Sequence, residues 1–234
     1  GYTLSYNMLD SNIDPTNGYL LEFKQDLAGL GGDVNYIRST FDARWYMPVY
    51  GDVVLMLRGQ AGNVSSWGGE DLRILDNFFK GPDLVRGFEP NGIGPRDLAS
   101  GIPGDFSTSD ALGGTLYWGT TAEIQFPLSF LPKEVGLKAA VFADAGSLWD
   151  YNGPTDFAGV TGDELTDCSA FKDSKDKGEH AICVADSDLV RSSVGVSLIW
   201  KSPFGPLRFD YAWALTKEDY DRIQQFRFGG GTKF

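Results

Sequence analysis

Apolar and polar side chains alternate with a period of two along most of this chain, as they do in half-buried β-strands. No stretch shows the 3.6-residue period of a long helix. The pattern therefore predicts an all-β protein with about nine antiparallel strands. Eight segments alternate clearly and one, at residues 2–9, does so weakly; the clear ones are 18–28, 36–47, 53–61, 116–126, 135–144, 193–201, 207–213 and 226–234.

The connections between these segments alternate in length, which indicates how the strands are joined. Short, proline-containing connections are expected at 10–17, 48–52, 127–134 and 202–206. Between them lie the connections 29–35, 65–111, 149–190 and 216–223, two of which are very long. Proline ends strands because it cannot donate a ladder hydrogen bond. Alternating short and long connections are typical of an up-and-down meander, the topology of outer-membrane β-barrels.

Alternation alone leaves two barrels open. A soluble barrel turns its apolar face inward, whereas a transmembrane barrel turns it outward toward lipid. The polar faces carry charges of both signs, which suits a water-filled interior, and no apolar run approaches the ~20 residues of a membrane helix. These features favour a transmembrane β-barrel. Aromatic residues also recur near strand ends, where an interfacial girdle is expected, namely Tyr19, Trp45, Trp118, Phe126, Trp200, Trp213 and Phe234.

The composition limits the possible partners, and the strand count indicates how much of a barrel the chain forms. The 234 residues include 20 basic and 32 acidic side chains, and the net charge of −12 argues against a nucleic-acid partner. Nine strands is an odd count, whereas bacterial single-chain barrels have even numbers. We expect a mature protein or a piece of one that forms the C-terminal part of a larger barrel. The alternative is that residues 2–9 form no strand and that eight strands close alone.

The long connection at residues 65–111, here called the signature loop, is too apolar to be disordered. Leu84, Val85, Phe88 and Ile93 lie close together in it, so we expect the loop to pack into the barrel lumen. There, Arg86 would need carboxylate partners, because a buried unpaired guanidinium is very costly.

Two carboxylates are candidates for this pairing. Glu123 and Asp144 fall on the polar faces of neighbouring predicted strands, and arginine can hold carboxylates in bidentate geometry. In the alternative interpretation, Arg86 sits in a solvated turn and the carboxylates pair with Lys138 or Arg58.

The last predicted strand, 226–234, must pair with another strand edge to close a barrel. Glycines weaken the side-chain packing of a strand, so the seam formed by this strand should open more easily than other strand pairs. Alternatively, the glycines only relieve crowding at a kink. The glycine run follows no strand-to-helix turn, which excludes a phosphate-binding loop. The residues of this predicted seam and terminus are Phe226, Phe228, Gly229, Gly230, Gly231 and Phe234.

The other long connection, residues 149–190, is strongly acidic. Residues 151–190 carry a net charge of −6, which suggests a solvated external loop; contacts with divalent ions or lipopolysaccharide are the alternative. Cys168 and Cys183 form a disulfide if the compartment is oxidising, or stay free thiols. The lone His180 is expected to be solvated. No catalytic, metal or cofactor constellation is apparent, so no enzyme is expected.

Several motifs, taken in order, resemble the outer-membrane insertase and two-partner-secretion transporter superfamily. Val85-Arg86-Gly87-Phe88 with Ile93-Gly94-Pro95 is similar to its signature loop, and 142–146 (FADAG) to its second barrel motif. Residues 14–18, 202–207, 210–212 and 225–228 resemble its proline-glycine turn and its last strands. The resemblance covers nearly the whole chain.

The resemblance implies a fold and a function. It implies the last nine strands of a sixteen-stranded barrel that follows periplasmic POTRA domains, with Arg86 paired to Glu123 and Asp144. Within the superfamily the chain is most similar to the central subunit of the outer-membrane β-barrel assembly machinery of Gram-negative cells. Substrate strands would enter at the seam and leave laterally, and Phe234 would match the terminal recognition signal of such barrels.

The implied partners are unfolded outer-membrane proteins, accessory assembly lipoproteins, and outer-membrane lipid and lipopolysaccharide. A passive or two-partner-secretion transport pore of the same superfamily is the alternative function.

Overall fold

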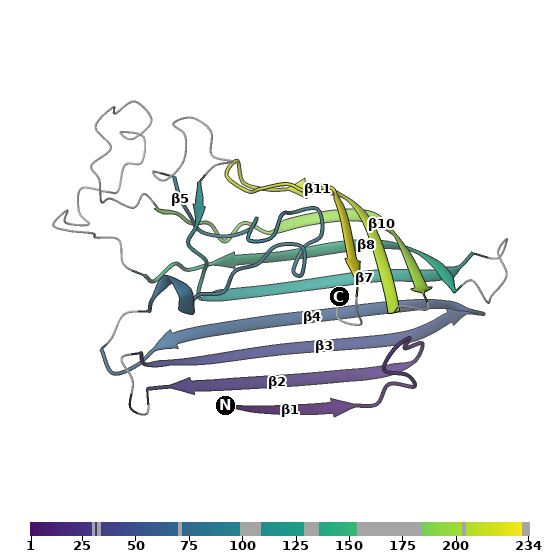
Figure 1. Ribbon diagram of the computed structural model, residues 1–234, viewed down its shortest axis with the longest axis horizontal. Helices are drawn as coiled ribbons and strands as arrows, with labels where there is room; N and C mark the ends of the chain where they lie inside the picture. Colours follow the sequence, from purple (N-terminus) through teal and green to yellow (C-terminus); the bar gives the residue numbers. More distant parts are fainter. Residues whose placement is uncertain are drawn as a thin grey trace.

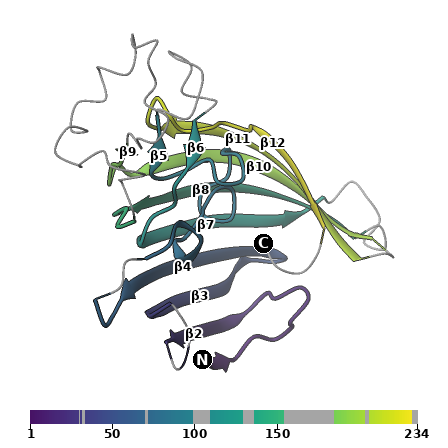
Figure 2. The same cartoon turned by 60° about the vertical axis from the view of Figure 1, so that its left-hand side comes forward.

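A computed structural model describes residues 1–29, 31, 34–69, 72–98, 109–128, 136–153, 184–202 and 205–230. Nine strands form one antiparallel sheet in chain order, and the sheet is open, as a partial barrel would be (Figures 1 and 2). The predicted nine-stranded meander is confirmed. Its strands are β1 (Tyr2–Asn7), β2 (Gly18–Ala28), β3 (Tyr36–Tyr50), β4 (Val53–Ser66), β7 (Leu116–Pro127), β8 (Leu137–Trp149), β10 (Arg191–Ser202), β11 (Gly205–Thr216) and β12 (Phe226–Gly230).

Small elements lie between the long strands. A 3-10 turn spans Ile74–Asp76, and β5 (Arg96–Asp97), β6 (Asp110–Ala111) and β9 (Val184–Ala185) form a second sheet in the order β6-β5-β9. The signature loop shows no helix or strand signal in its sequence, yet it contains the 3-10 turn, β5 and β6. Two-residue strands are too short to produce a readable alternation.

Three prolines lie in strands rather than in the connections predicted for them. One of them, Pro127, is the last residue of β7. β3 continues through Pro48 to Tyr50, with an irregularity in its register against β4 between these two residues. β11 begins at Gly205 and so includes Pro206. Proline is tolerated at such positions because a strand end or an irregular register leaves no ladder hydrogen bond to lose.

The outer face of the sheet is apolar and the inner face is polar. Val141 is 44% exposed and Leu198 38%, and Val196 lies beside Val141 in the register between β8 and β10. On the other face, Glu123 is 0% exposed and Asp144 is also buried. This arrangement confirms the transmembrane orientation, because a soluble barrel would bury the aliphatic set. Within the described ranges, no helix is both long and apolar enough to cross a membrane.

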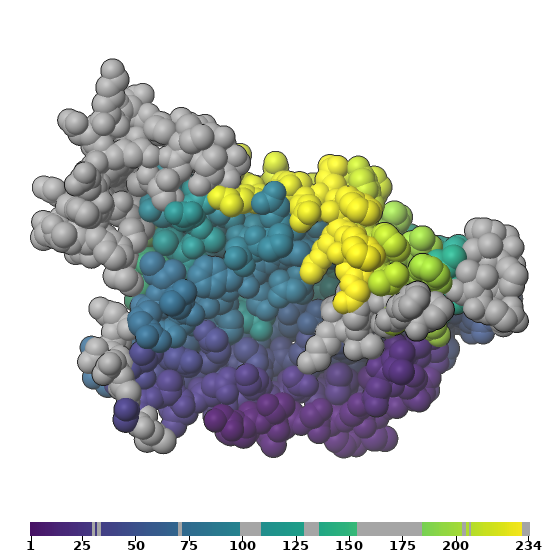
Figure 3. Space-filling model, viewed as in Figure 1, coloured from purple at the N-terminus to yellow at the C-terminus, as the bar shows by residue number. Residues whose placement is uncertain are grey.

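The buried apolar core lies between the signature loop and the inner side of the sheet. In the space-filling view, the blue loop segment packs into the concave side of the sheet (Figure 3). The core therefore occupies part of the lumen, and it excludes water from the contact between the wall and the loop. Its residues are Val64, Leu72, Phe78, Leu84, Val85, Phe88, Ile93, Tyr117 and Leu148.

Two glycines make room for the tip of the loop. Gly119 of β7 and Gly146 of β8 lie opposite each other in the register. A Cβ atom on Gly119 would lie 2.4 Å from Cδ1 of Leu84, and one on Gly146 would lie 3.1 Å from Cγ of Leu84. The bare backbone at this pair lets the loop approach the wall closely.

The orientation of the sheet predicts opposite outcomes for arginine on its two faces. Val196→Arg should lower the free energy of unfolding by about 2–4 kcal/mol, because the cation would face hydrocarbon. Met56→Arg should cost far less, because Met56 lines the polar interior opposite Glu123. Urea unfolding of the full-length protein in lipid vesicles measures both. Equal costs at the two positions would contradict the orientation.

Candidate functional site

A tight turn presents Arg86 to the wall of the lumen. The backbone N–H groups of Leu84 and Val85 both donate to the carbonyl oxygen of Gly81, at 3.0 Å each. Gly87 has φ +95°, a left-handed conformation that favours glycine, and a Cβ there would lie 3.2 Å from Cβ of Ala212 in β11. The turn and the buried side chains of Leu84 and Val85 therefore fix where the guanidinium points.

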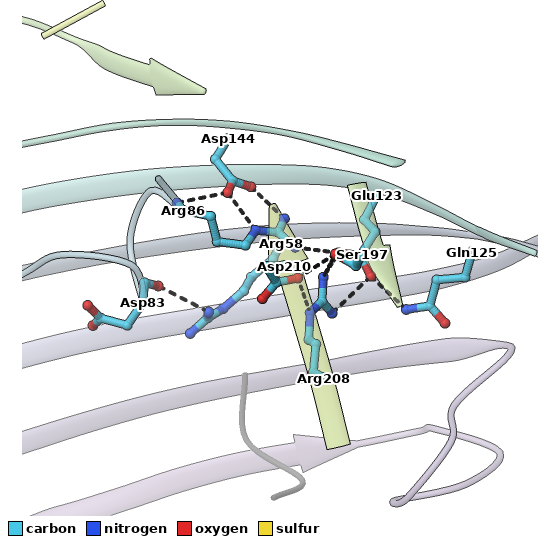
Figure 4. Close-up of polar contacts among 9 residues, drawn as sticks. All are labelled: Arg58, Asp83, Arg86, Glu123, Gln125, Asp144, Ser197, Arg208 and Asp210. Carbon is cyan, nitrogen blue, oxygen red and sulfur yellow. Dashed lines mark hydrogen bonds and ion pairs between the residues drawn. The ribbon is translucent and has the colours of Figure 1, made fainter. Parts of the chain in front are cut away.

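Arg86 binds two carboxylates from neighbouring strands (Figure 4). Its Nε donates to Oδ2 of Asp144 at 2.7 Å and its Nη2 to Oδ1 at 2.7 Å, which is a bidentate pair. Its Nη1 donates to Oε2 of Glu123 at 2.6 Å. The Arg86 side chain is 11% exposed. Sequence reasoning singled out these three residues, and the structure brings them together.

Two further contacts hold the Arg86 residue. Its backbone N–H donates to Oδ2 of Asp144 at 3.1 Å. Its guanidinium carbon lies 3.4 Å from the ring centroid of Phe142, so the cation stacks on an aromatic face. Phe142 and Asp144 belong to the FADAG segment in β8. This short segment therefore supplies both the anion and the ring that receive the arginine.

The alternative partners predicted for the carboxylates are engaged elsewhere. Arg58 donates to Oδ2 of Asp42 from Nη2 at 2.5 Å and from Nε at 2.9 Å. Lys138 donates to Asp14 at 2.6 and 2.8 Å, and Lys201 also binds Asp14. Asp14 belongs to the turn between β1 and β2, so this turn reaches across to β8 and β10.

The residues that follow Arg86 in the signature loop are hydrogen-bonded to the segment that leads into β12. The N–H of Glu89 donates to the carbonyl of Arg222, and the N–H of Gln224 donates to the carbonyl of Gly87, both at 3.0 Å. Phe88 is fully buried and forms an isolated β-bridge with Ile223. Sequence reasoning treated residues 216–223 only as a connection, because hydrophobic alternation carries no information about such contacts.

A second arginine also reaches Glu123. Arg208 of β11 donates from Nη2 to Oε2 of Glu123 at 2.5 Å and from Nη1 to Oε1 at 3.2 Å (Figure 4). Sequence reasoning missed this role. The available signal was that Arg208 and Asp210 occupy the polar face of the strand 207–213, the face that turns toward the lumen.

A cavity of about 570 Å³ lies beside these ion pairs in the lumen. Arg86, Glu123 and Arg208 line it on one side, and Gly229 and Gly230 of β12 also border it. The site is thus next to the strand predicted to form the seam.

The other predicted site residues are placed only in part. Phe226 and Phe228 of β12 are exposed on the outer face, and the Phe228 ring lies 5.0 Å from that of Phe209. Cys168, Cys183, Gly231, Phe234 and His180 lie outside the described residues, as does most of the acidic connection at 149–190. The disulfide and the external position of that connection remain predictions.

An open sheet with an apolar outer face, and a loop bound by ion pairs to its polar inner face, defines part of a transmembrane β-barrel with an internal loop. The model of the Omp85 superfamily domain matches residues 1–234, so the chain belongs to the Omp85 superfamily. The chain is accordingly a multi-pass β-barrel segment of an outer membrane.

Similar proteins carry related names. The chain is 37% identical over 229 residues to an outer membrane protein assembly factor BamA from Neorickettsia risticii, and 29% identical over 231 residues to one from Neisseria meningitidis. These alignments cover 97% of the chain but only 26% and 28% of the two relatives. A human sorting and assembly machinery component 50 homolog is 32% identical over 149 residues, which is 61% of the chain and 30% of that protein.

A solved structure has the same fold. The crystal structure of BamA from Haemophilus ducreyi lacking POTRA domains 1–3 matches with a TM-score of 0.74 and 25% identity. The match covers 97% of this chain and 40% of that one. The chain therefore spans about a quarter of the two bacterial relatives and less than half of this solved chain.

The geometry of the Arg86 pairs predicts that a lysine cannot replace the arginine. Arg86→Lys keeps the charge but loses the planar fork that reaches two carboxylates, so the loop should detach more often. Val85→Cys, at a fully buried position, reports detachment through its rate of maleimide labelling in the full-length protein. We expect labelling at least about 10-fold faster, since breaking a buried pair costs several kcal/mol.

Arg44→Lys is the matched control for this experiment. Arg44 pairs with Asp42 on the same inner face, and among the described residues no hydrogen bond joins it to the loop, so its substitution should leave the labelling rate unchanged. Equal rates in the parent and in Arg86→Lys would contradict the role of the bidentate geometry.

Proposed function

We propose that this chain is part of the central subunit of an outer-membrane β-barrel assembly machinery, which folds and inserts outer-membrane proteins through a lateral seam. One observation carries the proposal: 97% of the chain aligns, at 37% identity, with a relative named as an outer membrane protein assembly factor. The human relative is also named as a sorting and assembly machinery component. A passive or two-partner-secretion pore is not favoured, and the loop packed in the lumen also argues against a wide channel.

The glycines of β12 support a seam at this strand. In the described part of the chain, β12 pairs with β11 from Leu207 to Tyr211. Gly229 and Gly230 lack side chains that could pack across such a junction. A strand with weak side-chain packing separates more easily and then presents unpaired backbone groups.

An exposed edge in the membrane gives the proposed reaction its driving force. Backbone N–H and C=O groups in hydrocarbon have no water to bind, so an incoming strand that pairs with them is strongly favoured. This pairing is β-augmentation, and it needs no covalent chemistry. We therefore propose a non-catalytic insertase whose substrates are unfolded outer-membrane proteins.

The remaining partners follow from the surface and from the resemblance. The apolar outer face requires lipid around it, and we propose outer-membrane lipid and lipopolysaccharide as this surrounding lipid. Accessory assembly lipoproteins are carried over from the resemblance to the assembly machinery alone.

Locking the seam should abolish assembly without unfolding the barrel. Gly229→Cys, joined by a disulfide to a cysteine on the first strand of the full-length barrel, should stop insertion of a test outer-membrane protein into vesicles. Reduction should restore insertion. The control is a disulfide between Val196→Cys and Tyr211→Cys, which are register partners in β10 and β11. This disulfide should leave insertion unchanged.

Two readouts separate the candidate functions in this experiment. An insertase with a locked seam loses assembly and keeps its folded, heat-resistant mobility on a gel. A transport pore keeps its single-channel conductance when the seam is locked. Undiminished insertion with the seam fully oxidised would overturn the proposal.

A further inference from the structure

We propose that Arg208 is a positioning residue for the loop site: it holds Glu123 in place for Arg86 and thereby makes the attachment of the signature loop depend on β11. The inference rests on the proposed function only where it links loop attachment to seam opening, since the proposed seam strand β12 pairs with β11. The arrangement itself is a property of the lumen and can be tested without any substrate.

The geometry shows Glu123 shared by two guanidinium groups. Its Oε2 accepts from Nη1 of Arg86 at 2.6 Å and from Nη2 of Arg208 at 2.5 Å. Its Oε1 accepts from Nη1 of Arg208 at 3.2 Å and from Nε2 of Gln125 at 2.9 Å. Arg208 is therefore the main donor to this carboxylate, and Arg86 makes a single bond to it.

Charge balance explains why a second arginine is needed. Arg86 already neutralises Asp144 through a bidentate pair, and Glu123 is completely shielded from water. With Arg86 alone, two buried carboxylates would share one cation, which leaves a costly uncompensated charge. Arg208 supplies a second positive charge at Glu123, which it shares with the buried carboxylate of Asp210.

Arg208 is itself held in one orientation. Its Nε donates to Oδ1 of Asp210 at 2.7 Å and its Nη2 to Oγ of Ser197 at 2.8 Å, while the Ser197 hydroxyl also donates to Asp210. Together with the bonds to Glu123, these contacts engage all three nitrogen atoms of the guanidinium (Figure 4). The side chain is therefore a preorganised partner for Glu123.

The position of Arg208 in the sheet links its ion pair with Glu123 to the proposed seam. Glu123 is on β7 and Arg208 on β11, and the strand order β7-β8-β10-β11 places two strands between them. The ion pair therefore bridges the inner curve of the sheet. Arg208 is also the register partner of Gly229 in β12. An outward movement of β11 with the seam strand would pull Arg208 from Glu123 and weaken the hold on Arg86.

The test measures labelling of Val85→Cys in the full-length protein, in lipid and without substrate. Arg208→Met should speed labelling by about 10-fold, because Glu123 is left without its main donor and the loop detaches more often. Arg208→Lys keeps the charge and should recover part of the protection. Arg44→Met, which removes another lumenal arginine that is paired with Asp42, is the control and should leave the rate unchanged.

A double-mutant cycle separates positioning from general support of the barrel. If Arg208 acts through Glu123, Arg208→Met should change the labelling rate less than about 2-fold in a Glu123→Gln background. An equal effect of Arg208→Met with and without Glu123→Gln would overturn the inference, as would parent-like labelling in Arg208→Met. Should Arg208→Met fail to fold, the same cycle is run with Arg208→Lys.

The inference and the proposed function can fail independently. If the cycle shows no coupling between Arg208 and Glu123, but insertion of a test barrel still requires an unlocked seam, the inference fails and the proposed function stands. If Arg208 and Glu123 are coupled, but the protein inserts no test barrel, the proposed function fails and the inference stands.

Discussion

The structure depends on the cost of placing a guanidinium inside a protein lumen. A buried cation is tolerated only where carboxylates and hydrogen bonds replace the water it has lost. Arg86 meets this condition with a bidentate pair to Asp144, a bond to Glu123 and a stacked ring at Phe142. These partners exist because the barrel is inverted, with its polar residues facing inward. The outer apolar face and the inner ionic site are two results of one alternation along the strands.

The ion pairs and the apolar core both attach the loop, and each contributes in a different way. Leu84, Val85 and Phe88 supply burial, which is strong but not directional. Arg86 supplies direction, because the bidentate fork accepts one orientation of its partner. The backbone bonds at residues 222–224 add a third attachment next to β12. The loop is thus connected both to the interior wall and to the proposed seam.

Much of the architecture could be predicted from the sequence, and the failures have physical causes. The nine strands follow from alternation, because a period of two is a direct property of strand geometry. Arg86, Glu123 and Asp144 could be proposed as a group because a buried arginine needs anions, and the resemblance of the motifs to the superfamily favoured this grouping over pairing of the carboxylates with Lys138 or Arg58. β5, β6 and β9 could not be predicted, because two residues carry no period.

The role of Arg208 shows a different limit of sequence reasoning. Alternation identifies Arg208 and Glu123 as sharing the inner face, but it does not say which strands meet across the curve of the sheet. The contact depends on the curvature that places β11 opposite β7. The packing of Leu84 against Gly119 and Gly146 is hidden for the same reason, because it joins a loop to a distant strand pair.

The central claim is that pairing between Arg86 and Asp144 holds the signature loop in the lumen. The most direct measurement is the coupling free energy between the two side chains, from a cycle of Arg86→Gln, Asp144→Asn and the double variant, with loop opening read by hydrogen exchange. The account predicts a coupling of about 1–3 kcal/mol in favour of the native pair. A coupling near zero, with the loop equally protected in all four proteins, would contradict it.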